Sequence, residues 1–582
     1  MNLLTAILEK FKQWKNDFQW PNIKQWRQFF HVSSRQEKYQ LTAFAVLAIM
    51  GILLLSLKIY QNITIVKPVQ GGQIRIAITG SPRFLNPTLS SANDPDEDMI
   101  SVIFSSLFKY DGDGALKEDL VQKYAIGDNG KIYDITIKEN VKWHDKKPLN
   151  IDDVIFTIQT IQNPDFRSPL RTFWQGIELE KIDDLTLRIK LKNSYASFLN
   201  NLTFGILPKH LWEKIPAAQF ALNELNLKPV GSGPYKFTKL QKDKQGNVKS
   251  IEVQAFSGYF EEEPFISSIV FNFYSSEPNV YTDYKKDNLD VFSFVSAEIF
   301  ADIKNKPDNS ISIYSLTLPR YFAVFFNQSE NKFLADKTIR QALIWSTNKK
   351  EIIDQVFNGF GKEINSPLIE GMTGYSNQIK TYDFALEHAK NTLAAAGWQD
   401  IDDDKVLEKD NQKLEITLTS IDWPELTKAA ELIKKQWEEL GVKVTLDIKE
   451  TAKVQNETIK PRLYQSLLFG EVLGFEPDLF HFWHSTQKKE SGLNLALYEN
   501  AEVDKLLSSA LEDMDPVSRT AKNQQVATLI VEDVPAIFLF SPSYVLVAKK
   551  NIKGITLKNI NTPSSRFSQI NQWYLKTHRV FK

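Results

Sequence analysis

The chain has 582 residues and a formal charge of −1; 42% of its residues are hydrophobic and 24% are charged, a composition typical of globular rather than disordered proteins. Residues 1–60 carry a net charge of +5, which leaves −6 for residues 61–582, and this mildly acidic part argues against nucleic acid as a partner. The absence of cysteine excludes disulfides, thiolate metal sites and a lipid-modified cysteine anchor.

The first predicted element is a membrane-spanning helix over residues 41–57. This segment contains no charge and lies between Lys38 and Lys58, and its length is at the short end of the range for a spanning helix. A buried core helix and a cleaved signal peptide are the alternatives. Forty residues precede the segment, many more than the short polar region of a signal peptide, and no small-residue cleavage site follows it. Both observations favour an uncleaved anchor.

The distribution of Lys and Arg around this segment predicts its orientation. Seven Lys or Arg precede it after residue 9, whereas only Lys58 and Lys67 follow closely. The positive-inside rule then places the N-terminus in the cytoplasm and residues 61–582 outside, with a single pass through the cytoplasmic membrane. We expect residues 1–40 to form a basic amphipathic segment on the inner leaflet, with a partner-binding or partly disordered tail as the alternative. Residues 58–70 form a tether.

Beyond the tether, strand and helix patterns alternate along the chain. Isoleucines at every second position from 74 to 78 indicate a half-buried strand. Asn150 is a suitable N-cap for a helix over 152–161. A second helix is predicted over 425–440, ended by Gly441 in a left-handed conformation. Further strands are predicted at 133–137, 185–191, 414–418 and 442–448. The predicted class is mixed α/β with more than one core.

The sequence lacks the common catalytic and cofactor-binding motifs. It contains no phosphate-binding loop, no dinucleotide fingerprint, no HExxH and no GxSxG. One histidine pair, His481 and His484, follows Asp478 and could place three ligands on one helix face. The aromatic residues around the pair favour a structural or cleft-lining role over a metal site. The sequence therefore predicts no catalysis, no resident metal and no cofactor.

Seven segments resemble one protein family in the right order. They lie between residues 71 and 540, and they are GGQIRIAITGSPRFLNP (71–87), ITIKENVKWHDKKPLNIDDVIFTIQ (135–159), PVGSGPYKF (229–237), ADKTIRQALIWSTNKKEII (335–353), YDFALEHAKNTLAAAGW (382–398), AAELIKKQWEELGVKVTLDI (429–448) and VEDVPAIFLF (531–540). They are similar to the large extracytoplasmic solute-binding proteins of peptide-type ABC importers, the group of oligopeptide-, dipeptide- and nickel-binding proteins. One departure is Lys146, where glycine is usual.

The resemblance implies a two-lobe periplasmic-binding-protein-like fold of the large peptide-binding class (type II). A hinge joins the lobes and closes the cleft between them on the solute. Such a protein, expected to be monomeric, delivers solute to a membrane permease, while separate subunits hydrolyse ATP. The implied division is lobe I at 71–326 with an inserted subdomain at about 114–225, lobe II at 327–535, and a return to lobe I at 536–582.

The resemblance also implies candidate ligand-binding residues. In the family an Asp before a Pro-containing turn anchors the peptide amino end, but Leu473 stands at that position here, and Glu471 could supply the carboxylate instead. For each aromatic candidate a core position is an equal alternative. The candidates are Asn86 and Tyr321 from lobe I, and Trp423, Glu471, Phe475 and Trp483 from lobe II.

Three functions remain open on the sequence alone. The leading hypothesis is capture of peptides, mainly oligopeptides, for an ABC permease. Leu473 and the histidine pair keep a metal chelate or an oligosaccharide as the alternative solute. A membrane-anchored ligand sensor, with residues 1–40 contacting a cytoplasmic partner, is the third, and an extracellular enzyme comes last because no catalytic constellation is present.

Overall fold

The computed structural model describes residues 22–90, 93–293, 296–305, 308–490 and 492–582. The chain divides into two units, which we describe separately. One consists of Met1–Val69 with Thr577–Lys582, and the other of Gln70–Lys576.

The smaller unit is built around one long apolar helix. Helix α2 (Ile23–Val32) is followed by α3 (Arg35–Ile63), whose N-terminus has a capping box between Ser34 and Glu37. Among the described residues, α3 is the one helix long and apolar enough to cross a membrane, and none of its residues is buried. It extends beyond the expected segment 41–57 at both ends. Residues 1–21 of the expected amphipathic segment lie outside the described part.

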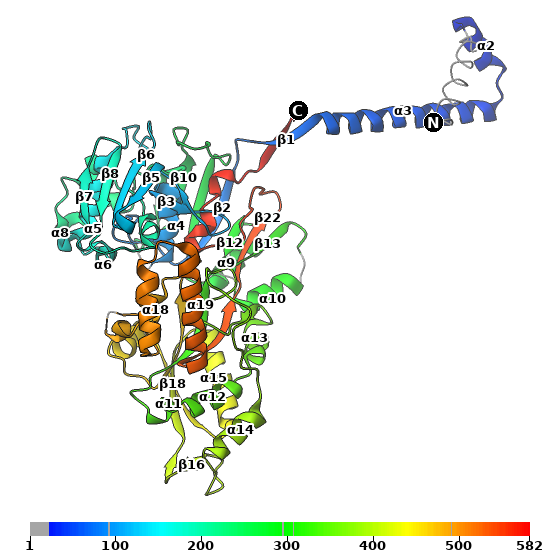
Figure 1. The fold of residues 1–582 in the computed structure, drawn as a ribbon. Helices are drawn as coiled ribbons and strands as arrows, with labels where there is room; N and C mark the ends of the chain where they lie inside the picture. The colour runs from blue at the N-terminus through cyan, green and yellow to red at the C-terminus, as the bar shows by residue number, and fades with distance from the viewer. Residues whose placement is uncertain (1–21, 91–92, 294–295, 306–307, 491) are drawn as a thin grey trace, which may run out of the picture. The chain divides into compact units, whose positions relative to one another are not determined.

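A short sheet follows this helix directly. Strand β1 (Thr64–Val69) pairs with β23 (Lys576–Phe581) in a two-stranded sheet (Figure 1). The guanidinium of Arg579 donates to Thr64 Oγ1 at 2.9 Å. The stretch expected to be a simple tether is therefore partly a paired strand.

The larger unit contains a seven-stranded mixed sheet. Strand β2 confirms the alternating isoleucine pattern, since Ile74, Ile76 and Ile78 are all buried, and it runs parallel to β11 and β12. In spatial order the strands are β13 (Ile311–Leu316), β22 (Tyr544–Lys549), β12 (Val291–Ser293), β2 (Gln73–Thr79), β11 (Ser268–Tyr274), β10 (Val248–Ala255) and β9 (Tyr235–Lys242). The helices of this part include α4 (Asp94–Ile103), α9 (Glu277–Lys285) and α10 (Ala297–Asn305).

A second large sheet has six strands. Their order is β15 (Gly361–Glu363), β21 (Ala536–Pro542), β14 (Arg320–Phe326), β20 (Ser466–Val472), β18 (Glu415–Ile421) and β19 (Lys443–Lys449). Helix α15 (Pro424–Leu440) buries Ile433 and Trp437 and ends at Gly441, whose φ of +100° confirms the predicted left-handed residue. The other helices of residues 327–535 include α12 (Lys337–Trp345), α13 (Lys349–Phe357), α14 (Leu386–Ala395), α17 (Leu479–Trp483), α18 (Ala501–Glu512) and α19 (Pro516–Asp533), of which α18 and α19 lie side by side (Figure 1).

A four-stranded antiparallel sheet forms a third core. Its order is β5 (Val121–Gly127), β6 (Ile132–Ile137), β8 (Thr186–Lys190) and β7 (Glu178–Lys181). Helix α5 (Ile151–Gln162) packs against it and begins with the expected Asn150 cap, whose side chain accepts from the Asp152 amide at 3.0 Å.

The chain passes between the two large sheets twice. Residues 317–319 connect β13 to β14, and Ser543 connects β21 to β22. Both β14 and β21 belong to the six-stranded sheet. Tyr321, which the resemblance assigns to the first lobe, therefore lies in the second large sheet, while the expected lobe boundaries at 326 and 535 stay a prediction.

Candidate functional site

Two adjoining cavities lie in the larger unit. The first has a volume of about 490 Å³ and the second of about 410 Å³. Asp94 and Pro563 line both cavities, so the two spaces meet at the first turn of α4. Together they form the candidate functional site.

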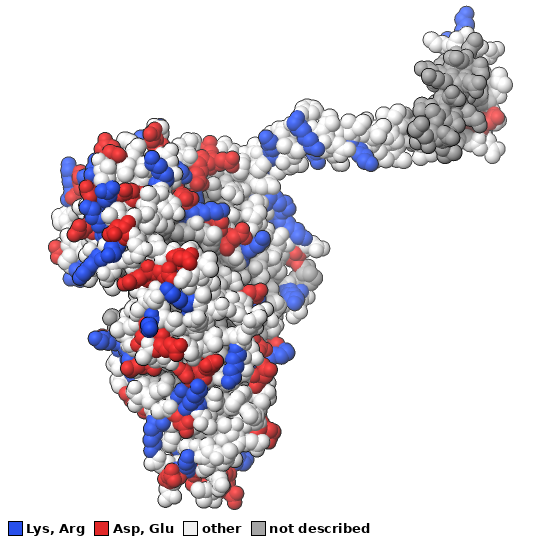
Figure 2. Space-filling model, viewed as in Figure 1, with Lys and Arg blue, Asp and Glu red and all other residues white. Residues whose placement is uncertain are grey.

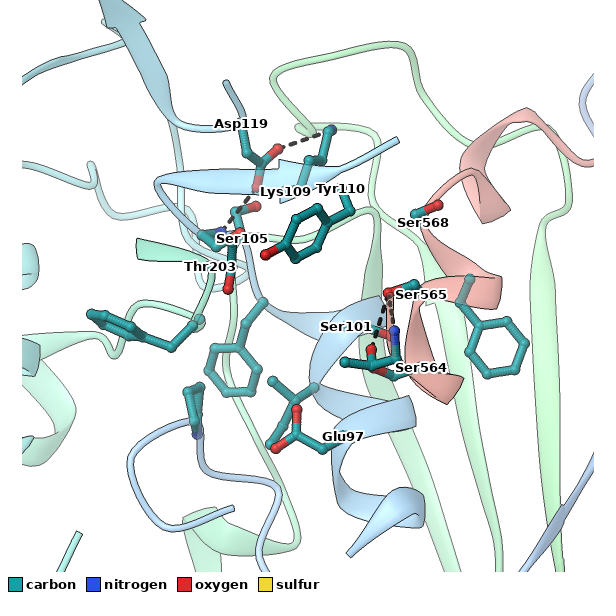
Figure 3. Close-up of a pocket in the computed structure, with 18 of the residues that line it drawn as sticks. Glu97, Ser101, Ser105, Lys109, Tyr110, Asp119, Thr203, Ser564, Ser565 and Ser568 are labelled. Carbon is teal, nitrogen blue, oxygen red and sulfur yellow. Dashed lines mark hydrogen bonds and ion pairs between the residues drawn. The ribbon is translucent and has the colours of Figure 1, made fainter. Parts of the chain in front are cut away.

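Hydroxyl groups are frequent in the first cavity, although most of its lining is apolar. Its walls come from α4, from β3 (Phe108–Tyr110) with Asp119, and from the 3-10 helix η7 (Pro563–Phe567) (Figure 3). Lys109 Nζ lies 2.9 Å from Asp119 Oδ1 and 2.9 Å from Glu261 Oε1, so its charge is already matched. The hydroxyl-bearing residues labelled in Figure 3 are Ser101, Ser105, Tyr110, Thr203, Ser564, Ser565 and Ser568.

Glu97 is the carboxyl group with the least charge compensation in this cavity. Ser90 Oγ donates to its Oε1 at 2.8 Å, but burial outweighs this hydrogen bond and raises the pKa of Glu97 to about 7. A cationic or hydrogen-bond-donating solute group beside Glu97 would favour its ionised form.

A buried ion pair fixes one wall of the first cavity. Arg566 of η7 donates from Nη1 to Asp98 Oδ1 of α4 at 2.6 Å, and a second bond joins Nη2 to Oδ2. The two side chains are 1% and 0% exposed. Burial raises the pKa of Asp98, and the positive charge of Arg566 opposes this rise. The pair joins two elements more than 450 residues apart in sequence.

The second cavity lies between the two large sheets. Tyr544 and Val545 of β22 line it from the seven-stranded sheet. Phe322 of β14 and Val472 of β20 line it from the six-stranded sheet. The remaining lining is mixed: four aromatic residues, which we call the aromatic wall, lie beside the acids Asp94, Glu277 and Glu425. The aromatic wall consists of Phe300, Phe357, Phe360 and Trp423. An apolar space between two bodies of a protein is a common form of ligand site.

Arg320 is the cationic side chain of this second cavity. Its Nε is buried and has no hydrogen-bond partner, and its guanidinium lies 5.4 Å from the ring centroid of Phe322. Burial lowers the pKa of Arg320, and the nearby charge of Asp94 partly offsets this effect.

Trp423 is the one predicted site residue that lines a cavity, and it is 47% exposed. Asn86 is fully buried and shapes its own turn: its Oδ1 accepts from the Thr88 amide at 3.0 Å, and its Nδ2 donates to Asn226 Oδ1 at 3.2 Å. The expectation that Asn86 binds solute stays a prediction.

Glu471 and Tyr321 contact each other rather than the cavities. The Tyr321 hydroxyl donates to Glu471 Oε2, and Glu471 Oε1 has no partner. Tyr321 is 0% and Glu471 5% exposed. Burial raises the pKa of Glu471 to about 8, so this group is largely protonated at neutral pH. A neutral, enclosed carboxyl is a poor anchor for a peptide ammonium group, and its predicted binding role stays a prediction.

Phe475 and Trp483 are buried by neighbouring parts of the fold. The Phe475 amide donates to Asn561 Oδ1 at 2.9 Å, and its ring lies against Gly114 and Gly371. Trp483 is 1% exposed and packs against Phe325, Tyr498 and Phe538. For these two residues as well, solute binding stays a prediction.

The histidine pair does not converge on one point. His481 Nε2 lies 3.5 Å from Asp478 Oδ2, whereas the ring nitrogens of His484 contact Thr486 and Ser508. Within the described ranges, the one group of three potential metal ligands is the exposed set Asp400, Asp402 and Asp404. Lys413 pairs with two of these carboxylates, as expected for a solvated turn.

Two of the sequence motifs contact each other behind the first cavity. The Gly231 amide donates to His144 Nδ1 at 3.2 Å, and the His144 amide donates to the Gly231 carbonyl at 2.8 Å. A Cβ on Gly231 would lie 1.9 Å from the carbonyl oxygen of Ile103. Gly231 therefore permits close packing against the end of α4, without lining the cavity itself.

Sequence reasoning missed Arg320 and the three phenylalanines of α10, α13 and the loop after α13. A single cation at the start of an apolar strand, LPRYFAVFF, is a signal that could have singled out Arg320. Nothing in the sequence distinguishes Phe300, Phe357 and Phe360 from the many phenylalanines of the core.

Comparisons with known proteins agree on one family. The sequence model of the bacterial extracellular solute-binding proteins, family 5 (middle), matches residues 115–492. The oligopeptide-binding protein AppA of Bacillus subtilis (strain 168) is 29% identical over 522 residues, which cover 88% of this chain and 92% of AppA. The dipeptide-binding protein of Escherichia coli (strain K12) is 25% identical over 519 residues, covering 84% and 93% of the two chains.

Solved structures extend this agreement to the fold. The structure of AppA from Bacillus subtilis in complex with a nonapeptide matches with a TM-score of 0.71, covering 88% of this chain and 100% of AppA. NikZ from Campylobacter jejuni in complex with Ni(L-His) is 25% identical and matches with a TM-score of 0.72, covering 86% and 99% of the two chains. The chain thus has the mixed α/β periplasmic-binding-protein fold, and it belongs to the family 5 bacterial extracellular solute-binding proteins of ABC transporters, which bind solutes and are not enzymes.

Proposed function

We propose that the protein captures peptides in the two adjoining cavities and delivers them to an ABC permease in the same membrane. The observation that carries the proposal is the second cavity, because both large sheets line it and a movement of one sheet against the other would open or close it. The similarity to AppA, whose structure holds a nonapeptide, supports a peptide as the solute.

The mixed linings of the two cavities suit a peptide. Hydroxyl groups in the first cavity offer hydrogen bonds to a backbone of any sequence, and the aromatic wall of the second accepts an apolar side chain. Together, the two adjoining cavities favour a solute longer than a single amino acid.

Native mass spectrometry of the full chain, purified in mild detergent without denaturation, tests this proposal. Released ligands are then identified by fragmentation. A ladder of short peptides would support peptide capture. One dominant chelate or sugar mass would contradict it and favour the alternative solute that Leu473 and the likeness to the Ni(L-His) complex of NikZ keep open.

We also propose that α3 is retained as a membrane anchor, with residues 64–582 on the extracytoplasmic side. Its 29 residues exceed the roughly 20 needed to span a bilayer, and Lys and Arg are concentrated before it. The test is the intact mass of the protein recovered from carbonate-washed membranes. The uncleaved mass in the membrane pellet is expected, and a shorter soluble product would contradict anchoring.

A further inference from the structure

The protein itself satisfies the charge and the hydrogen-bond donors of the Arg320 guanidinium only in part. With the described residues it forms no ion pair and no side-chain hydrogen bond, and its Nε is enclosed without an acceptor. Arg320 as a whole is half-buried, but a guanidinium nitrogen that is enclosed without an acceptor is costly and is therefore uncommon in a folded protein. By contrast, Arg566 at the neighbouring wall is bound by Asp98 through two nitrogens.

The surroundings of Arg320 leave room for a partner of a particular shape. The cavity beside it has a volume of about 410 Å³ and presents Phe300, Phe357, Phe360 and Trp423. Phe300 and Phe360 meet edge to face, with centroids 4.2 Å apart, so this wall is closely packed. A planar anion at Arg320 would place an adjoining apolar group against these rings.

Carboxylates around the cavity restrict the charge of such a partner. Asp94, Glu277 and Glu425 line the same space, and Glu277 accepts a hydrogen bond from the Ser296 amide. One guanidinium facing three acids suits a single carboxylate and disfavours a phosphate or another polyanion, because each added negative charge would meet like charges.

We propose that Arg320 binds the C-terminal carboxylate of the solute and that the aromatic wall binds its last side chain, which makes this protein selective for peptides with a free acid and an apolar C-terminal residue. This inference rests on the proposed peptide function and assigns the orientation of the peptide in the site. Arg320 would form two parallel N–H···O bonds to the carboxylate.

Matched peptide pools test the proposal with the full chain. Pools of three, five and nine residues, free of Asp and Glu inside and ending in Phe, are made as free acids and as C-terminal amides. Dissociation constants are measured by tryptophan fluorescence and confirmed by native mass spectrometry. The wild-type protein is expected to bind the acids roughly 10- to 100-fold more tightly than the amides.

Arg320→Gln is expected to reduce this difference to about 3-fold or less, and Arg320→Lys to leave an intermediate difference, since Lys keeps the charge without the planar pair of donors. Arg167→Gln is the matched control: Arg167 is exposed and lines neither cavity, so the full difference is expected. Trp423→Ala is expected to reduce the preference for C-terminal Phe over Gly while keeping the acid–amide difference. Thermal unfolding of each variant checks that it is folded.

Two results separate this inference from the proposed function. If the wild type binds acids and amides equally, or if Arg320→Gln keeps the difference, the carboxylate is bound elsewhere and the inference is wrong, although peptide capture stands. If the wild type binds none of the pools, peptide capture fails and the inference fails with it.

Discussion

Glu471 is a buried carboxyl group on β20 whose replacement by glutamine should stabilise the protein in a pH-dependent way. Its side chain is 5% exposed, accepts one hydrogen bond from Tyr321 and has one oxygen without a partner. Burial raises its pKa from 4.5 to about 8, because the charged form is poorly solvated there.

The sign of the effect follows from this rise. The folded state binds the proton more tightly than the unfolded state, so the stability contributed by protonated Glu471 is complete below about pH 4.5 and is lost as the pH rises towards 8. At about 1.4 kcal/mol per pH unit, the upper limit of the loss is roughly 5 kcal/mol. Relaxation around the charge and one unsatisfied amide donor in the variant reduce the expected net gain at pH 8.5 to about 2 kcal/mol.

The assay is thermal unfolding of wild type and Glu471→Gln between pH 5 and pH 8.5. The variant should unfold at about the same temperature as the wild type, or slightly below it, at pH 5, and about 2 °C above it at pH 8.5, because the entropy of unfolding of a unit as large as Gln70–Lys576 is high. Glu139→Gln is the control, because Glu139 is exposed and should give no pH-dependent gain. Parallel pH profiles for wild type and Glu471→Gln would refute the reasoning, since they would mean that Glu471 ionises without penalty.

Two further substitutions probe the walls of the first cavity. Gly231→Ala should destabilise the protein by more than about 2 kcal/mol, because the new methyl group would overlap the Ile103 carbonyl. Urea unfolding measures this loss of stability. Gly127→Ala is the control and should cost far less, because the nearest atom to its new methyl group is 3.8 Å away. Arg566→Met should cost about 3–5 kcal/mol, because it leaves Asp98 buried without its partner, so that this carboxyl group must either stay charged without compensation or take up a proton. A second change, Asp98→Asn, should recover part of that loss, and no recovery would contradict the ion-pair explanation.

Local sequence patterns predicted individual elements closely. The helix expected over 425–440 is α15, Pro424–Leu440, because its apolar spacing, proline start and glycine end are all local features. The apolar segment 41–57 predicted the position of α3 but not its length, since the helix continues through polar residues to Ile63. Hydrophobicity marks the part that can enter a membrane, whereas hydrogen bonding and capping decide where a helix ends.

The residues that line the candidate site were much harder to predict from the sequence. The sequence alone does not distinguish Trp423 from Trp483 as candidate ligand contacts. In the structure, Trp423 is 47% exposed in a cavity wall, whereas Trp483 is 1% exposed in the core. Which aromatic residue faces a cavity depends on how separate elements pack. The same holds for Arg320, because its lack of a partner becomes visible only when β14 and the residues of the seven-stranded sheet are placed around it.

The pairing of β1 with β23 changes how the binding unit is attached. Thr64–Val69 are committed to a strand and the Gly71 amide donates to the Phe265 carbonyl at 2.8 Å, so few residues between α3 and β2 are without backbone hydrogen bonds. A second chain connection runs back at Lys576. If α3 is retained in the bilayer, as proposed, this attachment would keep the binding unit at a high effective concentration beside a permease in the same membrane, so that loading depends on encounters within the membrane plane rather than on diffusion through the surrounding fluid.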